Sequence, residues 1–363
     1  MDYSDTLLLY GLERMDGERT VSGLYHLLTG KKSSQTVQDG KLFGLSHLFG
    51  TFHGYTYARF EEKMQDFIQS GWINLTDASN ARLTERGQSV LDENLKRSPI
   101  PTSLDGWRYG DIGTVFWRRF TLYVQTLSHL LENERHFYPI QNDPQVLQWV
   151  KRHFPRDPRS RHMSAEGIYS ELKILLSTVE GNDADNFVLR LSRKDRIGKT
   201  TRQIGEIIGL DPFESHIRFL GTLHKMIQTV MADRRSFPHI HIFIADCSQP
   251  YTLTESTRKT FELLKDGYTF DDIVRIRKLK ESTIEDHIVE IAIHVPEFEI
   301  SPFISIEDQK RIFAVSKRLR SKRLKWIKQE LQEEFSYFQI RLTLAKGIEN
   351  VLKEEKGVRS RVD

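Results

Sequence analysis

A run of positive charge near the C-terminus is the part of this sequence best suited to a chemical task. Residues 310–328 contain no aspartate or glutamate. Their basic residues are Lys310, Arg311, Lys317, Arg318, Arg320, Lys322, Arg323, Lys325 and Lys328. Such a run can neutralise nucleic-acid phosphates and release their counterions. A solvated helix face is the alternative, but the acids resume abruptly at Glu330, which favours a phosphate or an acidic protein partner.

Apolar residues within this basic run predict one buried side and one basic side. The residues expected to face a core are Ile312, Val315, Leu319 and Leu324. We expect alanine at Arg320, Lys322 and Arg323 to weaken DNA binding and to flatten its salt dependence, by about one unit of slope per lost phosphate contact.

Two further lysines are candidates for phosphate contact. Lys31 and Lys32 follow the second helix expected from the N-terminal sequence. Because net charge is only +3, a nucleic-acid surface must be a local patch of this kind.

No catalytic pattern accompanies these cations. Gly198-Lys199-Thr200 matches the end of a phosphate-binding loop, but Arg193 stands where the cradle needs its upstream glycine. Neither a nucleophile elbow nor an HExxH pair occurs, and the single Cys247 excludes a disulfide framework and a multi-cysteine zinc site. We therefore expect a protein that is not an enzyme and uses no cofactor or metal.

Length and composition indicate a soluble globular protein of roughly two or three domains. The chain has 363 residues, of which 38% are hydrophobic and 28% charged. No uncharged apolar stretch approaches the length that spans a bilayer. We expect a cytoplasmic location, in association with the nucleoid.

Turn signals and apolar spacing upstream of the basic run predict a helix-turn-helix over residues 252–294. A first helix should stop at Gly267, and a second should begin at the N-cap Thr269. A capping box from Ser282 to Glu285 predicts the start of the third helix, which enters the major groove in DNA-reading motifs. Its expected outward residues include Glu285, Asp286 and Glu290, and carboxylates repel phosphates. We therefore expect the basic run to contact DNA. The helix-turn-helix of residues 252–294 is interpreted as the support of that run or as a partner-docking face.

Helical periodicity and one hairpin signal characterise the first hundred residues. Helices are expected over residues 6–15, over residues 21–28 and up to Gly71. Residues 72–75 and 82–84 flank a turn and predict a β-hairpin, so the order of elements suggests a winged helix.

The middle of the chain is expected to be mostly helical. Its early aromatic residues, Trp107, Phe116, Trp117, Phe120 and Tyr123, are interpreted as core. A second helix-turn-helix-like pattern covers residues 201–226 around Gly209 and Pro212, and alternating isoleucines at 240–244 suggest a short strand or extended connection.

The predicted fold is mainly α, with three domains in chain order. Residues 1–98 form a winged-helix domain with a small β-hairpin wing, residues 103–240 a helical middle domain, and residues 250–363 a helix-turn-helix domain. Two prolines in Ser98-Pro99-Ile100-Pro101-Thr102 predict a linker after the first domain.

Distinctive motifs occur at both ends of the chain. The C-terminal motifs are Leu324-Lys325-Trp326-Ile327-Lys328, Phe335-Ser336-Tyr337 and Ile340-Arg341-Leu342. They resemble the helix-turn-helix domain at the C-terminus of many RecQ-family helicases. The N-terminal motifs are Leu27-Leu28-Thr29-Gly30-Lys31-Lys32, Phe43-Gly44-Leu45, Phe49-Gly50, Gly71-Trp72-Ile73 and Leu83-Thr84-Glu85-Arg86-Gly87. Their order is similar to the winged helix of the RecQ C-terminal region.

Taken whole, the chain resembles the YpbB family, which in Gram-positive bacteria is encoded beside a short RecQ-like helicase. The resemblance implies a non-catalytic partner of that helicase, which engages forked or single-stranded DNA during recombination or repair. Two alternatives stay open at this point: a helix-turn-helix transcription regulator, and an adaptor that binds the acidic tail of single-stranded DNA-binding protein.

Overall fold

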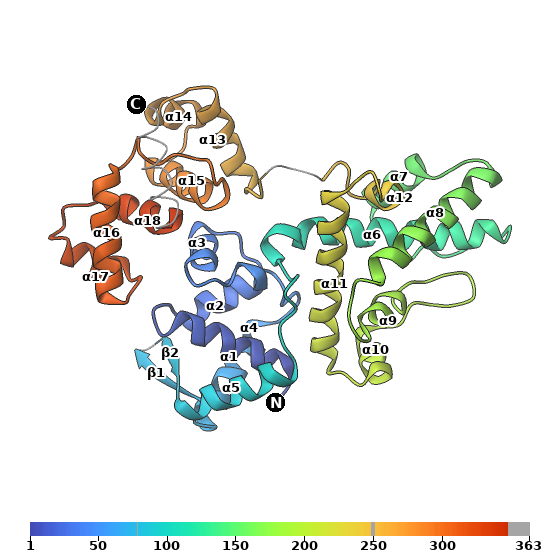
Figure 1. Ribbon diagram of the computed structural model, residues 1–363, viewed down its shortest axis with the longest axis horizontal. Coiled ribbons are helices and arrows are strands. Elements are labelled where there is room, and N and C mark those ends of the chain that lie inside the picture. Colours follow the sequence, from blue (N-terminus) through green and yellow to red (C-terminus); the bar gives the residue numbers. More distant parts are fainter. Residues whose placement is uncertain (78, 248–250, 348–363) are drawn as a thin grey trace. The chain divides into compact units, whose positions relative to one another are not determined.

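The computed structural model describes residues 1–77, 79–247 and 251–347, and it is mainly helical, as predicted (Figure 1). Contacts divide the chain into two compact units. The first comprises Met1–Tyr10, His47–Thr51 and Glu85–Gln249, and the second Gly11–Ser46, Phe52–Thr84 and Pro250–Asp363. Helix α1 (Tyr3–Met15) contributes residues to both units. The three consecutive domains stay a prediction, and residues 348–363 of the last lie outside the described residues.

The first unit is built from helices around an aromatic core. Its helices are α5 (Glu85–Arg97), α6 (Gly106–Leu131), α7 (Pro144–His153), α8 (Pro158–Leu176), α9 (Asp183–Val188), α10 (Thr201–Ile208), α11 (Pro212–Ala232) and α12 (Pro238–His241). Phe116, Phe120 and Tyr123 of α6 are at most 2% exposed, so their interpretation as core is confirmed. Among the described residues, no helix combines the length and apolarity needed to cross a bilayer.

The strand or extended connection suggested at residues 240–244 is wrong. Pro238 occupies the first turn of α12, and turns continue the chain after it. Ile240, Phe243 and Ile244 are each at most 1% exposed. Their i, i+3, i+4 spacing puts all three on one side of a helical path, whereas a strand would turn Phe243 away from the isoleucines.

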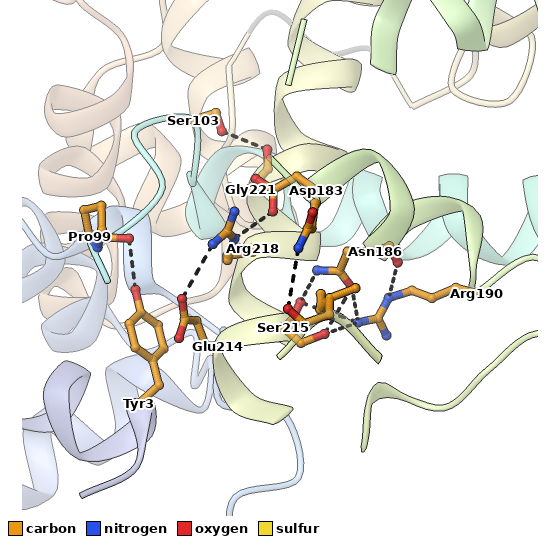
Figure 2. A network of polar contacts seen from close by, with 12 residues as sticks. Tyr3, Pro99, Ser103, Asp183, Asn186, Arg190, Glu214, Ser215, Arg218 and Gly221 are labelled. Carbon is orange, nitrogen blue, oxygen red and sulfur yellow. Dashed lines mark hydrogen bonds and ion pairs between the residues drawn. The ribbon is translucent and has the colours of Figure 1, made fainter. Parts of the chain in front are cut away.

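The second helix-turn-helix-like pattern forms α10, a turn and α11. Gly209 ends α10 in the left-handed region with φ 70°, and the Asp211 side chain caps α11 ahead of Pro212. Figure 2 shows the polar contacts that join α9 to α11, in which the Asn186 amide donates to the Ser215 carbonyl at 2.8 Å. These bonds satisfy polar groups that would otherwise be buried without partners.

A half-buried arginine belongs to the same network (Figure 2). The Arg190 guanidinium donates to Asn186 Oδ1 at 3.0 Å and to Thr201 Oγ1 at 2.9 Å, and it lies 4.4 Å from the centre of the Phe219 ring. Burial lowers the pKa of Arg190 to about 10. Arg190 therefore serves the internal packing of the first unit.

Near Pro99 the chain packs into the first unit. The Tyr3 hydroxyl donates to the Pro99 carbonyl at 3.2 Å, and the Ser103 hydroxyl donates to the Gly221 carbonyl of α11 at 2.8 Å (Figure 2). The segment interpreted as a linker thus has bonds at or beside both of its ends.

The N-terminal part of the second unit contains the predicted hairpin. Its elements are α2 (Val21–Leu28), α3 (Ser34–Leu42), α4 (Tyr57–Gln69), β1 (Ile73–Asp77) and β2 (Asn80–Leu83), and a 3₁₀ turn at Ser46–Leu48 lies where the two units alternate along the chain. The strands pair antiparallel with Ile73 opposite Leu83, while Ala78 of the turn lies outside the described residues. Gly30 and Gly71 have φ 82° and 67°, and both follow helices that end there because glycine adopts this conformation without strain.

The C-terminal part of the second unit carries the helix-turn-helix. Its helices are α13 (Glu255–Lys265), α14 (Phe270–Arg277), α15 (Glu281–His294), α16 (Ile306–Leu319), α17 (Leu324–Glu330) and α18 (Tyr337–Lys346). The Thr269 N-cap is confirmed: its hydroxyl accepts the Asp272 backbone N–H, and the Asp272 carboxylate accepts the Thr269 backbone N–H in return. The capping box at Ser282 is wrong, because α15 begins at Glu281 and Ser282 lies inside its first turn.

Candidate nucleic-acid interface

The basic run of residues 310–328 covers most of α16, the connection after it and most of α17. Ile312 and Ile327 are 0% exposed, and they anchor the two helices in the core of the second unit. Val315, Leu319 and Leu324 pack against the same core, so the predicted apolar side is confirmed. The remaining side of these helices carries the cations.

Carboxylates that follow the run in sequence neutralise three of its nine cations. The pairs are Arg311 with Glu334, Arg318 with Glu330, and Lys328 with Glu333. The Arg311 pair is bidentate, with one N–O distance of 2.9 Å, and this bond holds the pKa of Glu334 below its usual range. Water screens the exposed Arg311 and Arg318 pairs, so a phosphate can compete with the carboxylates for these two cations, whereas the Lys328 side chain is only 16% exposed.

Lys322 ties the connection between α16 and α17 to the N-terminal part of the second unit. Its backbone N–H donates to the Glu18 carboxylate at 2.8 Å, and its Nζ donates to the Leu42 carbonyl. Nζ also lies 4.9 Å from the centre of the Phe43 ring. Burial lowers the pKa of Lys322. This lysine, predicted to contact phosphate, therefore has a structural role.

Arg323 also contacts the N-terminal part. Its guanidinium donates to the Gly17 carbonyl and lies 4.5 Å from the centre of the Trp326 ring. Two of the three residues chosen for alanine substitution, Lys322 and Arg323, therefore form bonds that support the fold.

Lys317, Arg320 and Lys325 are the cations of the run that are most available for a ligand. All three are exposed, and none forms an ion pair with another residue of the described chain. Arg320 is the C-cap of α16 with φ 49°, a left-handed conformation that ends the helix. Lys310 lies on α16 and is half-buried.

A pocket of about 960 Å³ joins part of this run to the N-terminal part of the same unit. We call it the basic pocket. Its cationic lining residues are Arg14, Lys41, Lys310, Lys317, Arg320 and Lys322. Its apolar lining includes Met15, Leu42, Phe43, Phe313, Ala314, Leu344 and Ala345. Positive charge around an apolar floor suits an anionic ligand with an apolar or aromatic portion.

Two carboxylates also line the basic pocket, and both have partners. Asp16 pairs with Arg82 at 3.1 Å, and Glu18 accepts the Lys322 backbone N–H. The six cations therefore outnumber the acids, and the pocket keeps a positive charge. Arg14 and Lys41 carried no signal in the sequence, because only the tertiary fold brings them beside α16.

Lys31 and Lys32 do not line the basic pocket. Both are exposed in the connection between α2 and α3. Burial raises the pKa of Glu290 on α15, and the positive charge of Lys32 opposes this shift only in part. Their contact with phosphate stays a prediction.

Helix α15, the third helix of the helix-turn-helix, is covered on nearly all sides. It contacts α13, α14 and α18 and also α3. Glu290, expected to point outward, is 5% exposed and accepts the Thr254 and Thr257 hydroxyls at 3.0 and 2.7 Å. This expectation was wrong because Glu290 satisfies the N-terminal turn of α13. A helix so enclosed cannot enter a major groove without the second unit opening.

Arg341 of α18 connects three parts of the second unit. Its guanidinium pairs with Asp286 of α15 and donates to Gln38 Oε1 at 3.1 Å and to Ser34 Oγ at 3.0 Å on α3. The arginine of the Ile340-Arg341-Leu342 motif thus joins the helix-turn-helix to the N-terminal part.

Comparison with known proteins agrees with this architecture. A helix-turn-helix domain family matches residues 256–344, which indicates a DNA-binding protein. Protein YpbB of Bacillus subtilis (strain 168) is 34% identical over 350 residues, which cover 96% of this chain and 99% of that protein. No solved structure matches. With this identity over nearly the whole of both chains, the protein belongs to the YpbB family.

Proposed function

We propose that this protein is a non-catalytic accessory subunit of a RecQ-like DNA helicase and contributes the DNA contacts of the basic pocket during recombination or repair. The observation that carries the proposal is the joint origin of this pocket. Its cations come from Arg14 and Lys41 in the N-terminal part and from the basic run in the C-terminal part of one compact unit.

The chemistry of the basic pocket supports phosphate binding. Lys317 and Arg320 are exposed at its edge without a carboxylate partner in the described chain, so a phosphate does not have to displace an internal ion pair. Binding there should release counterions and weaken steeply as salt rises.

The resemblance of both ends to RecQ modules supports the choice of partner. The sequence resembles these modules and contains neither a phosphate-binding loop nor an acidic helicase box. A short helicase motor that lacks them would gain them in trans. We place this action in the cytoplasm, on the nucleoid.

The enclosure of α15 disfavours a transcription regulator. Such a protein reads base edges with its recognition helix, and α15 contacts four other helices of its own unit. Adaptor function through the acidic tail of single-stranded DNA-binding protein is the remaining alternative. An excess of acidic peptide that displaces DNA from the chain would support a shared surface, whereas independent binding of the two would place the peptide elsewhere.

The test is reconstitution with the neighbouring RecQ-like helicase. The two proteins should co-purify, and the full chain should increase unwinding of a forked DNA. Lys317→Ala combined with Arg320→Ala should reduce this stimulation while co-purification persists. Arg234→Ala with Arg235→Ala, which removes two exposed arginines from the first unit, is the matched control. If helicase and chain neither bind nor affect each other, the proposal fails.

A further inference from the structure

Trp326 of α17 is an aromatic side chain that the fold leaves at the surface. It is 48% exposed, whereas the adjacent Ile327 is 0% exposed. Ile327 and Leu331 fill the core on one side of α17, so the residue before Ile327 must point away from that core. Large aromatic residues are usually buried for much of their area, which makes an exposed indole within a basic run a candidate contact surface.

The indole is held in place by its neighbour. The Arg323 guanidinium lies 4.5 Å from the centre of the Trp326 ring and donates to the Gly17 carbonyl. That bond fixes the cation at the ring, so the orientation of the indole is constrained before a ligand arrives. Lys325, which directly precedes Trp326 in α17, is exposed and has no ion-pair partner among the described residues.

The position of this aromatic residue is continuous with the basic pocket. Gly17, which Arg323 contacts, lies between Asp16 and Glu18, and both of these line the pocket. Lys322 lines it as well, directly before Arg323. A strand whose phosphates lie along the pocket can therefore reach the indole.

We propose that Trp326 is a stacking platform for an unpaired base of single-stranded DNA, with Lys325 contacting an adjacent phosphate. This assignment rests on the proposed DNA binding of the chain, and it adds that the chain prefers unpaired strands. Base stacking on an aromatic ring beside cations is the general means by which proteins hold single strands without reading sequence. A base inside a duplex already stacks on its neighbours and cannot offer its face to an indole on a helix surface.

A second aromatic residue of the same unit repeats this arrangement. Tyr337, at the start of α18, is also 48% exposed, and Lys328 Nζ lies 5.5 Å from the centre of its ring. Tryptophan and arginine also occur at protein interfaces, so a protein partner is the competing occupant. The dense positive charge around Trp326 favours the nucleic acid.

The experiment compares Trp326→Ala, Trp326→Phe and Lys325→Ala in the full chain. Binding to a fluorescent oligothymidine and to a blunt duplex of equal length is measured by anisotropy over a salt series. Trp326→Ala should weaken oligothymidine binding about ten- to a hundredfold, leave duplex binding unchanged and keep the salt slope. Trp326→Phe should restore most of the affinity, because a phenyl ring still stacks. Lys325→Ala should instead reduce the slope by about 0.7.

Tyr138→Ala, which removes a 97% exposed aromatic residue of the first unit, is the matched control and should change nothing. If Trp326→Ala loses single-strand and duplex binding equally, or loses neither, Trp326 is not a stacking platform. Loss of helicase co-purification with oligothymidine binding intact overturns the proposal as well and assigns the indole to a protein partner. If the wild-type chain binds no DNA at all, the proposed DNA binding fails first, which separates the two failures.

Discussion

The Arg341 guanidinium pairs with the Asp286 carboxylate, and their side chains are 17% and 35% exposed. The helix that would enter a major groove in a DNA-reading motif is thereby bound to a helix of its own unit. The Asp286 carboxylate, which we expected to repel phosphate, forms an ion pair with an arginine of the same unit instead.

Arg341→Ala should destabilise the second unit by about 2 kcal/mol, because it removes bonds to Asp286, Gln38 and Ser34 together. Chemical denaturation measures this change, and hydrogen exchange should show faster opening of α3. Arg202→Ala is the matched control, since Arg202 forms a highly exposed pair with Glu206. Equal unfolding curves for wild type and Arg341→Ala would contradict the role given to this residue.

Replacing Lys317 and Arg320 together by alanine should flatten the salt dependence of duplex DNA binding by about two units of slope. Both side chains are exposed and outside the core, so the melting temperature should stay at the wild-type value. Binding isotherms at several salt concentrations provide the slope. A double variant that folds normally and keeps the wild-type slope would remove these two residues from the interface.

Lys322→Ala should lower stability as well as DNA affinity. The Lys322 ammonium donates to the Leu42 carbonyl and lies over the Phe43 ring, and alanine loses both contacts. A charged hydrogen bond of this kind contributes about 1.5–3 kcal/mol, which thermal or urea denaturation resolves. For stability alone, Lys325→Ala is the control, because Lys325 is exposed. If Lys322→Ala unfolds as the wild type does, its contacts with the N-terminal part do not stabilise the unit.

The first unit should lose stability as the pH falls below about 6.5. His224 is 1% exposed, and its Nδ1 accepts the Asp105 backbone N–H at 3.0 Å. Burial lowers the pKa of His224 to about 4, from about 6.5 in an unfolded chain. Protonation therefore favours unfolding, so this contribution is complete above pH 6.5 and decreases towards pH 4, by about 2 kcal/mol between pH 7 and pH 5.

His224→Gln should reduce this pH dependence, because an amide oxygen can accept the same bond without titrating. His136→Gln, at an exposed histidine, should retain it. The measurement is the free energy of unfolding across pH 4 to 8. A His224→Gln curve parallel to that of the wild type would exclude His224 as the titrating group.

Local signals in the sequence were enough to predict most elements. The Thr269 cap, the glycines that end helices at Gly30 and Gly209, and the apolar spacing around Ile312 act within a few residues. Such signals depend on residues that are close in sequence. Residues 240–244 were predicted wrongly because a short apolar run fits either period, and burial of Phe243 selected the helical path.

Local patterns in the sequence are sufficient to predict a mainly helical chain with a helix-turn-helix and a basic run between residues 310 and 328. Which of these cations face solvent depends on contacts between distant segments. Lys322 contacts Leu42 across 280 residues, and Arg14 and Lys41 approach α16 from equally far along the chain. Charge and spacing say what a side chain can bind, but its actual partner depends on packing between segments that the local pattern does not relate.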